Sequence, residues 1–237
     1  MTQIELTTLK LSFQIALFSV FLILPISLGI CCWMMRLPRT LQSVLDVVFS
    51  LPLAVPPVVT GYLLLIALGR NSAVGRTFEQ LFGIRLSFTF LGAVIAASVV
   101  AFPLAFRTLR SSLMSLDQQW IEAARTLGLS PFRTFIWIVL PLIWPSLVGA
   151  AILSFVRALG EFGATMVFAG SIEGETRTLS IQIWNLLQDP SGSSSMMRLL
   201  VISIVFCGLS LFATEVFLQR MQQTHFLWRN ESLNKNH

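Results

Sequence analysis

Residues 117–141 read DQQWIEAARTLGLSPFRTFIWIVLP, the most charged stretch between two long apolar runs. Helical spacing of apolar residues predicts a first short helix that Ser115 caps. Gly128 is expected to end it, because glycine adopts the left-handed conformation at low cost. Ser130 and Pro131 are typical of a second helix, in which serine caps and proline takes the first helical position. The stretch therefore predicts two short amphipathic helices joined by a rigid bend.

The composition indicates a membrane protein. Hydrophobic residues make up 55% of the 237-residue chain and charged residues 11%, whereas about 25% of residues are charged in ordinary soluble domains. The mean hydropathy is +0.79. The net charge of +5 is spread over the segments between apolar runs, so we interpret it as a signal of membrane topology and not of nucleic-acid binding. The length suits one transmembrane domain, residues 1–237.

Long apolar runs predict an all-α bundle of five transmembrane helices. The run near residue 160 either extends the fourth helix to residue 172 or forms a partly re-entrant segment. Residues 40–46, 70–85 and 173–197 are expected to be connections, the last an aqueous loop. The expected spans are about 11–35, 47–69, 86–106, 134–156 and 199–218, and the polar two-helix loop occupies residues 110–133.

Proline breaks the second predicted span. Pro52, Pro56 and Pro57 remove backbone hydrogen bonds from the helix. Inside a bilayer, the freed carbonyl groups are tolerated only against protein or a wet cavity. The break therefore indicates either a transport pathway, with Thr60 and Gly61 beside it, or a kink required for packing.

Catalysis is not expected in this chain. The sequence has no G-x-x-x-x-G-K-[ST] loop for nucleotide phosphates. His225 and His237 both lie in the polar tail and are too few for a metal site. Cys31, Cys32 and Cys207 lie in apolar runs, where cysteine behaves as a small hydrophobic residue.

The segment from residue 122 to residue 141 follows the pattern EAA-x3-G-x9-I-x-LP, with Ile138 before Leu140-Pro141. In this it resembles the permease subunits of binding-protein-dependent ABC importers, which have the type I permease fold. The resemblance implies that residues 110–133 are a cytoplasmic coupling loop that docks on an ATPase subunit. The alternative is an amphipathic helix lying on lipid. The implied coupling residues are Glu122, Ala123, Ala124, Leu127, Gly128, Leu129, Ser130 and Pro131.

Residues 51–65 and 157–184 are similar to the corresponding stretches of molybdate permeases. The resemblance implies that molybdate is the cargo, but sulfate and thiosulfate permeases share much of the Gly-Glu-Phe-Gly pattern at 160–163. Sulfate, thiosulfate and tungstate therefore stay open as cargo. The expected translocation-pathway or gate residues are Pro56, Pro57, Thr60, Gly61, Arg157, Glu161, Phe162 and Thr165.

Arg157 and Glu161 are an ionisable pair beside a membrane run. With Thr165 and the amides near Gly160 and Gly163, Arg157 could contact a tetrahedral dianion. The other interpretation is structural, because residues four apart on a helix pair readily. We favour the ion pair, because a transporter must release its cargo and a strong anion site would hinder release.

The resemblance implies several partners. They are a second copy of this chain, two ATP-binding ABC subunits that hold ATP and Mg²⁺, a periplasmic oxyanion-binding protein and membrane lipid. The expected location is the bacterial inner membrane, with the N-terminus outside and the C-terminus in the cytoplasm. A secondary transporter and a membrane scaffold without transport activity are the competing functions. A secondary transporter should carry several acidic residues that are paired with other groups inside the membrane. A scaffold should bind no ATPase subunit.

Overall fold

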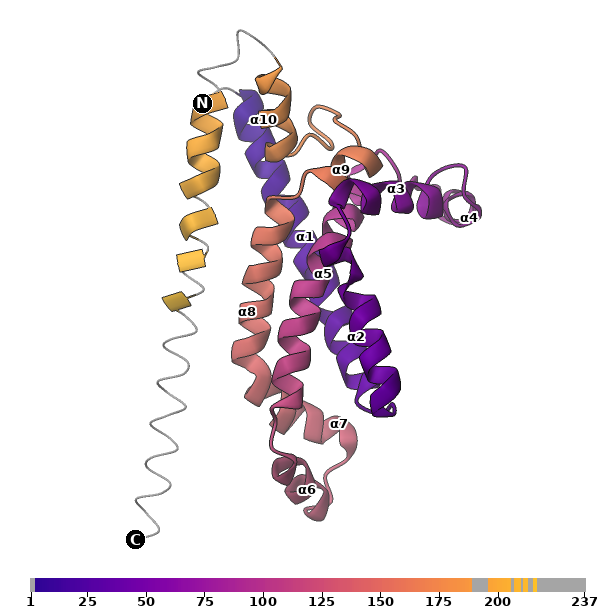
Figure 1. Cartoon of the computed structure of the whole chain (residues 1–237), viewed down its shortest axis with the longest axis vertical. Helices are drawn as coiled ribbons and strands as arrows, with labels where there is room; N and C mark the ends of the chain where they lie inside the picture. The colour runs from indigo at the N-terminus through magenta and orange to yellow at the C-terminus, as the bar shows by residue number, and fades with distance from the viewer. Residues whose placement is uncertain (1–2, 189–195, 206, 210, 213–214, 217–237) are drawn as a thin grey trace.

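The computed structural model describes residues 3–188, 196–205, 207–209, 211–212 and 215–216, and every regular element in these ranges is a helix (Figure 1). The elements form an elongated bundle with a shelf of short helices at one end. Their bounds are α1 Gln3–Met34, α2 Arg39–Ala54, α3 Pro57–Leu68, α4 Ala73–Phe82, α5 Phe90–Met114, α6 Gln118–Thr126, α7 Pro131–Thr134, the π-helical turn Phe135–Val139, α8 Leu140–Leu159, α9 Gly163–Phe168 and α10 Leu179–Leu187.

Three helical runs among the described residues are long and apolar enough to cross a membrane by themselves: α1, α5 and the continuous run Pro131–Leu159. Helices α2 and α3 meet this criterion only together, and they are bent by 110° at their junction. The fifth expected span, 199–218, begins in an apolar helix, Met196–Leu209, but part of it lies outside the described residues. The count of five spans therefore stays a prediction.

Helix α5 forms the centre of the bundle and packs against α1 and α8. One stripe of its buried face is made of small residues, since Ala93, Ala97, Ala101 and Ala105 are each at most 1% exposed. Small side chains let membrane helices approach closely, so that dispersion contacts and interhelical hydrogen bonds can form. One such bond joins α1 to α5, where the Ser19 hydroxyl donates to the Val94 carbonyl at 3.1 Å.

Two helices extend further than the sequence predicts. Helix α1 begins at Gln3, before the expected start at residue 11, and its Glu5 is 2% exposed and accepts a hydrogen bond from Arg198 at 2.9 Å. Helix α5 runs from Phe90 to Met114, past the expected end at residue 106. Apolar composition underestimated both helices, because each continues through charged residues that a search for apolar runs leaves out.

Three expected connections contain helices. Residues 40–46 belong to α2, which starts at Arg39. Residues 70–85 contain α4, which Ser72 caps by accepting a hydrogen bond from the Gly75 amide at 2.8 Å and which ends at left-handed Gly83. Residues 173–197 contain α10. Helix α10 is held against α1, because the Leu179 amide donates to the Ser12 hydroxyl at 2.6 Å.

The fourth span does not continue as a helix to residue 172. Helix α8 ends at Leu159, and the chain breaks at residues 160–162 before the separate six-residue helix α9. Helix α9 packs against α3. Figure 1 shows α3, α4, α9 and α10 at the end of the bundle that also holds the N-terminus, whereas α6 and α7 lie at the opposite end.

Candidate functional site

The first helix of the predicted coupling loop, residues 110–133, starts two residues later than the sequence predicts. Asp117 caps α6 by accepting a hydrogen bond from the Gln119 amide at 3.0 Å. Ser115 instead ends α5, since its amide donates to the Ser111 carbonyl at 3.1 Å and its hydroxyl donates to the Ser112 carbonyl at 2.8 Å. Ser115 is therefore not the cap of α6, because its hydroxyl is bonded to the preceding helix.

The bend between α6 and α7 has the geometry expected from the sequence. Gly128 has a φ of 76°, in the left-handed region that side chains disfavour. The Leu129 amide then donates to the Ala124 carbonyl at 3.0 Å, which closes the end of α6. Ser130 accepts a hydrogen bond from the Arg133 amide at 3.4 Å, and Pro131 is the first residue of α7. These bonds fix the angle between the two helices.

One side of the coupling loop faces the bundle and the other is open. Ala124 is buried, at 1% exposed. Glu122 and Ala123 are exposed, and Trp120 and Leu127 are 59% and 81% exposed. Ala124 therefore lies on the side that faces the bundle, and Trp120 and Leu127 lie on the open side. The result is an exposed surface with large apolar side chains, and exposed tryptophan such as Trp120 is typical of protein–protein interfaces.

The second group of predicted site residues lies where α2 turns sharply into α3. Helix α2 ends at Ala54, Pro56 precedes α3 in an extended conformation, and Pro57 is the first residue of α3. Pro56 is exposed and Pro57 half-buried, whereas Thr60 is 6% exposed. The proline break is therefore a turn of 110° between two helices, not a mild kink within one.

Helix α3 crosses α9 with direct backbone contact. A methyl group added to Gly61 would lie 2.7 Å from the Ala164 carbonyl oxygen. One added to Gly163 would lie 3.0 Å from Cβ of Pro57 and 3.1 Å from the backbone nitrogen of Val58. Glycine at both positions makes this approach possible. The two stretches that the sequence predicted separately, 51–65 and 157–184, thus meet in one place.

The Arg157–Glu161 pair lies at the entry to α9. Arg157 Nη1 donates to Glu161 Oε2 at 2.6 Å, and Glu161 Oε1 accepts from the Ala164 amide at 2.9 Å. The Glu161 side chain is 2% exposed and the Arg157 side chain 29% exposed. The carboxylate therefore joins the end of α8 to the start of α9, as the structural interpretation of this pair expects.

Two further predicted residues lie beside this pair. Thr165 is 1% exposed, and its hydroxyl has no hydrogen-bond partner among the described residues. The rings of Phe162 and Trp184 have centroids 5.6 Å apart, which connects the α8–α9 break to α10. The eight predicted pathway residues thus lie on α3 and α9 or close to their ends, and the eight predicted coupling residues lie at the opposite end of the bundle (Figure 1).

Sequence reasoning missed a buried ionic cluster between α2 and α5. Arg110, taken as a residue of the loop, is only 6% exposed. Its Nε donates to Asp46 Oδ1 at 3.2 Å, and its Nη2 donates to the side-chain oxygen of Gln42. The only sequence signal was a charged residue at each edge of an apolar run. Across the described residues, His, Cys, Asp and Glu side chains form no group of three that could hold a metal ion.

Comparison with curated proteins gives close matches. The chain is 39% identical over 219 residues to the molybdenum transport system permease protein ModB of Haemophilus influenzae, covering 92% of this chain and 96% of the relative. It is 40% identical over 215 residues to the protein of the same name from Escherichia coli strain K12, covering 91% and 94%. These relatives are named as transport permeases and not as enzymes.

Solved structures share the fold at low sequence identity. A chain of the MetNI methionine ABC transporter in inward-facing conformations matches with a TM-score of 0.70 and 17% identity, covering 93% of this chain and 99% of that one. A chain of a bacterial alginate ABC transporter, in complex with its pentasaccharide-bound periplasmic protein, matches with a TM-score of 0.72 and 12% identity, covering 93% and 80%. The family model described as binding-protein-dependent transport system inner membrane component matches residues 22–223, and the chain belongs to this family.

Proposed function

We propose that this chain is the membrane-spanning permease subunit of an ATP-driven importer that moves molybdate into the cytoplasm. The observation that carries the proposal is sequence similarity over nearly the whole chain to permeases named for molybdenum transport. The geometry supports the same role, because a fixed and exposed two-helix loop stands at one end of a membrane bundle. The chain moves cargo through the membrane, and ATP hydrolysis is assigned to a separate subunit.

The proposed complex holds two copies of this chain and two ATP-binding subunits. Each ATP-binding subunit contacts the exposed side of one coupling loop, around Glu122, Ala123 and Leu127, and holds ATP and Mg²⁺. An oxyanion-binding protein docks at the opposite end, near α9 and α10. This arrangement puts the coupling loop in the cytoplasm and the N-terminus outside, because the two lie at opposite ends of the bundle (Figure 1).

The mechanism follows from how the two ends are connected. The run Pro131–Leu159 leads from the coupling loop to the Arg157–Glu161 pair without a break. A packed helix moves as a rigid unit, so a displacement of α6 and α7 reaches α9 through α8. Helix α9 contacts α3 through Gly61 and Gly163. The α3–α9 crossing is therefore the proposed gate, which opens and closes as the ATP-binding subunits close and separate.

Cargo selection is assigned to the separate binding protein. Beside the proposed gate, Glu161 neutralises Arg157 at 2.6 Å. A weakly charged gate suits transport, because an ion must bind loosely enough to leave. Sulfate, thiosulfate and tungstate have the same tetrahedral dianionic chemistry, so they are the alternative cargoes.

The test is uptake by the reconstituted complex. The permease, its ATP-binding subunit and its binding protein are placed in proteoliposomes, and uptake of radiolabelled molybdate is compared with that of sulfate, thiosulfate and tungstate. We expect molybdate uptake that requires ATP and the binding protein. Uptake that persists without the ATP-binding subunit would identify a secondary transporter. If no ATP-binding subunit binds the chain, it is a scaffold.

A further inference from the structure

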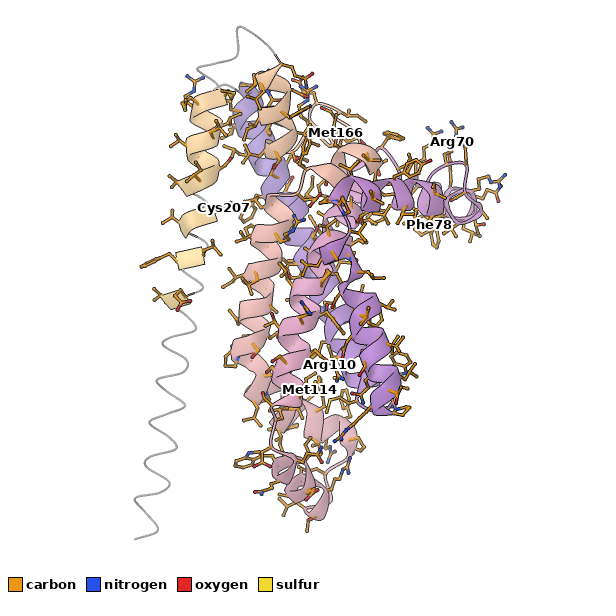
Figure 2. All side chains as sticks on the ribbon, in the orientation of Figure 1. Arg70, Phe78, Arg110, Met114, Met166 and Cys207 are labelled. Carbon is orange, nitrogen blue, oxygen red and sulfur yellow. The ribbon has the colours of Figure 1, made fainter. Side chains whose placement is uncertain are left out.

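A large open cavity lies between α2 and α5, near the end of the bundle that carries the coupling loop. Its volume is about 920 Å³. Apolar side chains share its lining with charged and hydroxyl groups, which come from Asp46, Ser50, Arg107, Arg110, Ser111 and Ser115. Figure 2 shows Arg110 in this part of the bundle, with Met114, another lining residue, one turn further along α5.

The two arginines in this cavity differ in their surroundings. Arg110 is buried and is held by Asp46 and Gln42 of α2. Arg107 lies three residues earlier on α5 and is exposed, and no ion pair joins it to another residue in the described ranges. Two guanidinium groups therefore line the cavity with a single carboxylate. The lining therefore has a net positive charge, and the guanidinium group of Arg107 is the part of that charge that an ion in the cavity can reach.

Resting on the proposed function, we propose that this cavity is a low-affinity site that the tetrahedral oxyanion occupies on its way to the cytoplasm. Arg107 is the ligand cation, because a guanidinium group offers paired N–H donors to an oxyanion. Ser50 and Ser111 are the hydroxyl donors. Arg110 does not bind the anion directly. It holds Asp46 at the wall of the cavity.

Two features of the cavity keep the affinity low. Asp46 is a carboxylate with a side chain 38% exposed, so it repels a dianion while it pairs with Arg110. The volume of about 920 Å³ far exceeds that of a five-atom oxyanion, so the bound ion keeps much of its hydration. Weak binding is what release requires, since a site on a transport route must let its ion leave.

The test measures occupancy at the cavity wall directly. Met114→Cys is introduced into the complete importer complex in nanodiscs, because Met114 lines the cavity and is exposed but is not a proposed ligand, and the rate of its reaction with a small neutral methanethiosulfonate is measured. The complex without this substitution gives the background from the native cysteines. We expect millimolar molybdate to slow the reaction, and chloride at equal ionic strength not to. Sulfate should also protect, because its shape and charge are the same.

Substitutions at Arg107 identify the ligand. Arg107→Gln should raise the molybdate concentration for half-maximal protection about tenfold, since losing one hydrogen bond to a charged group changes binding by about that factor. Arg107→Lys keeps the positive charge, so it should raise the molybdate concentration for half-maximal protection by a smaller factor. The matched control is Arg76→Gln, an exposed arginine on α4 at the other end of the bundle, and it should leave protection unchanged.

Three results would overturn the transit site: no protection by molybdate, equal protection by chloride, or protection that Arg107→Gln leaves unaltered. Uptake by the unsubstituted complex is measured in parallel. If uptake is normal and protection is absent, the transit site is wrong and the proposed function stands. If uptake itself fails with all four oxyanions, the proposed function is wrong.

Discussion

Gly61 on α3 lies so close to Ala164 on α9 that a methyl group on Gly61 would be 2.7 Å from the Ala164 carbonyl oxygen and 2.8 Å from its Cα. Both atoms belong to the backbone, so relief requires that the two helices separate. We therefore expect Gly61→Ala to lower the free energy of unfolding by roughly 1–3 kcal/mol, the range of overpacking substitutions. Thermal unfolding of the purified protein in detergent measures this.

Gly29→Ala is the matched control for this substitution. Gly29 lies within α1, and a methyl group there would meet nothing within 4 Å. Alanine is the better helix former by roughly 0.5–1 kcal/mol, so the control should melt at the same temperature as the parent or above it. If Gly61→Ala melts as high as Gly29→Ala, α3 and α9 are not in the contact described.

The Arg157–Glu161 pair predicts unequal effects of its two single substitutions. Arg157→Gln leaves the Glu161 carboxylate, whose side chain is 2% exposed, without its cation. Glu161→Gln leaves Arg157, which is 29% exposed and can reach water. An unpaired buried charge costs roughly 3–5 kcal/mol, so Arg157→Gln should be the more destabilising change. Thermal unfolding of both variants gives the order.

The double variant separates the structural role of this pair from a role in contacting cargo. If the residues only neutralise each other, Arg157→Gln with Glu161→Gln should recover most of the lost stability and most of the molybdate uptake. Recovered stability without recovered uptake would contradict the structural interpretation. It would show that at least one of the two charged groups takes part in transport beyond this pairing.

Ser12 fixes the start of α10, and we expect its loss to loosen that helix. Its hydroxyl accepts from the Leu179 amide at 2.6 Å and donates to the Thr8 carbonyl at 2.9 Å, in a buried position. Ser12→Ala leaves the Leu179 amide unpaired, at a cost of about 1–3 kcal/mol. Hydrogen exchange of residues 179–187 should become faster.

The control for Ser12 is Ser43→Ala. The Ser43 hydroxyl donates only to the Arg39 carbonyl within α2, at 3.2 Å and in an exposed position. Exposed substitutions of this kind change stability by less than about 0.5 kcal/mol. Equal exchange in the two variants would mean that the Ser12–Leu179 bond does not hold α10.

Local chemistry made the bend of the coupling loop predictable. Gly128, Ser130 and Pro131 each act on backbone within a few residues of themselves, so their spacing alone predicts a helix end and a helix start. The predicted cap of α6 was wrong by two positions. Ser115 and Asp117 are both of a type that caps helices, and only the structure shows which side chain is available to accept a hydrogen bond from α6. Ser115 is bonded to α5.

Long-range contacts were beyond sequence reasoning. The Arg110–Asp46 ion pair and the Gly61–Ala164 contact join residues far apart in the chain. The local sequence around each residue does not indicate which residue it contacts. Helices α4 and α10 were missed for another reason, because search for long apolar runs overlooks short amphipathic helices. The signals for α4 were present, since Ser72 caps it and Gly83 ends it.

Gly128 and Gly83 provide a matched test of the coupling loop. Both end a helix in the left-handed region, with φ of 76° and 67°, and a methyl group on either would meet nothing within 4 Å. Alanine at either position carries the same backbone strain, roughly 1–2 kcal/mol. Only Gly128 lies in the loop proposed to contact the ATP-binding subunit.

Gly128→Ala should therefore reduce both molybdate uptake and the ATP hydrolysis that the loaded binding protein stimulates. Gly83→Ala should leave both near the parent values, although thermal unfolding shows a similar loss of stability in the two variants. Strain at Gly128 changes the angle between α6 and α7, and with it the fit to the ATP-binding subunit. Equal transport by the two variants would show that this bend does not transmit the work of ATP hydrolysis.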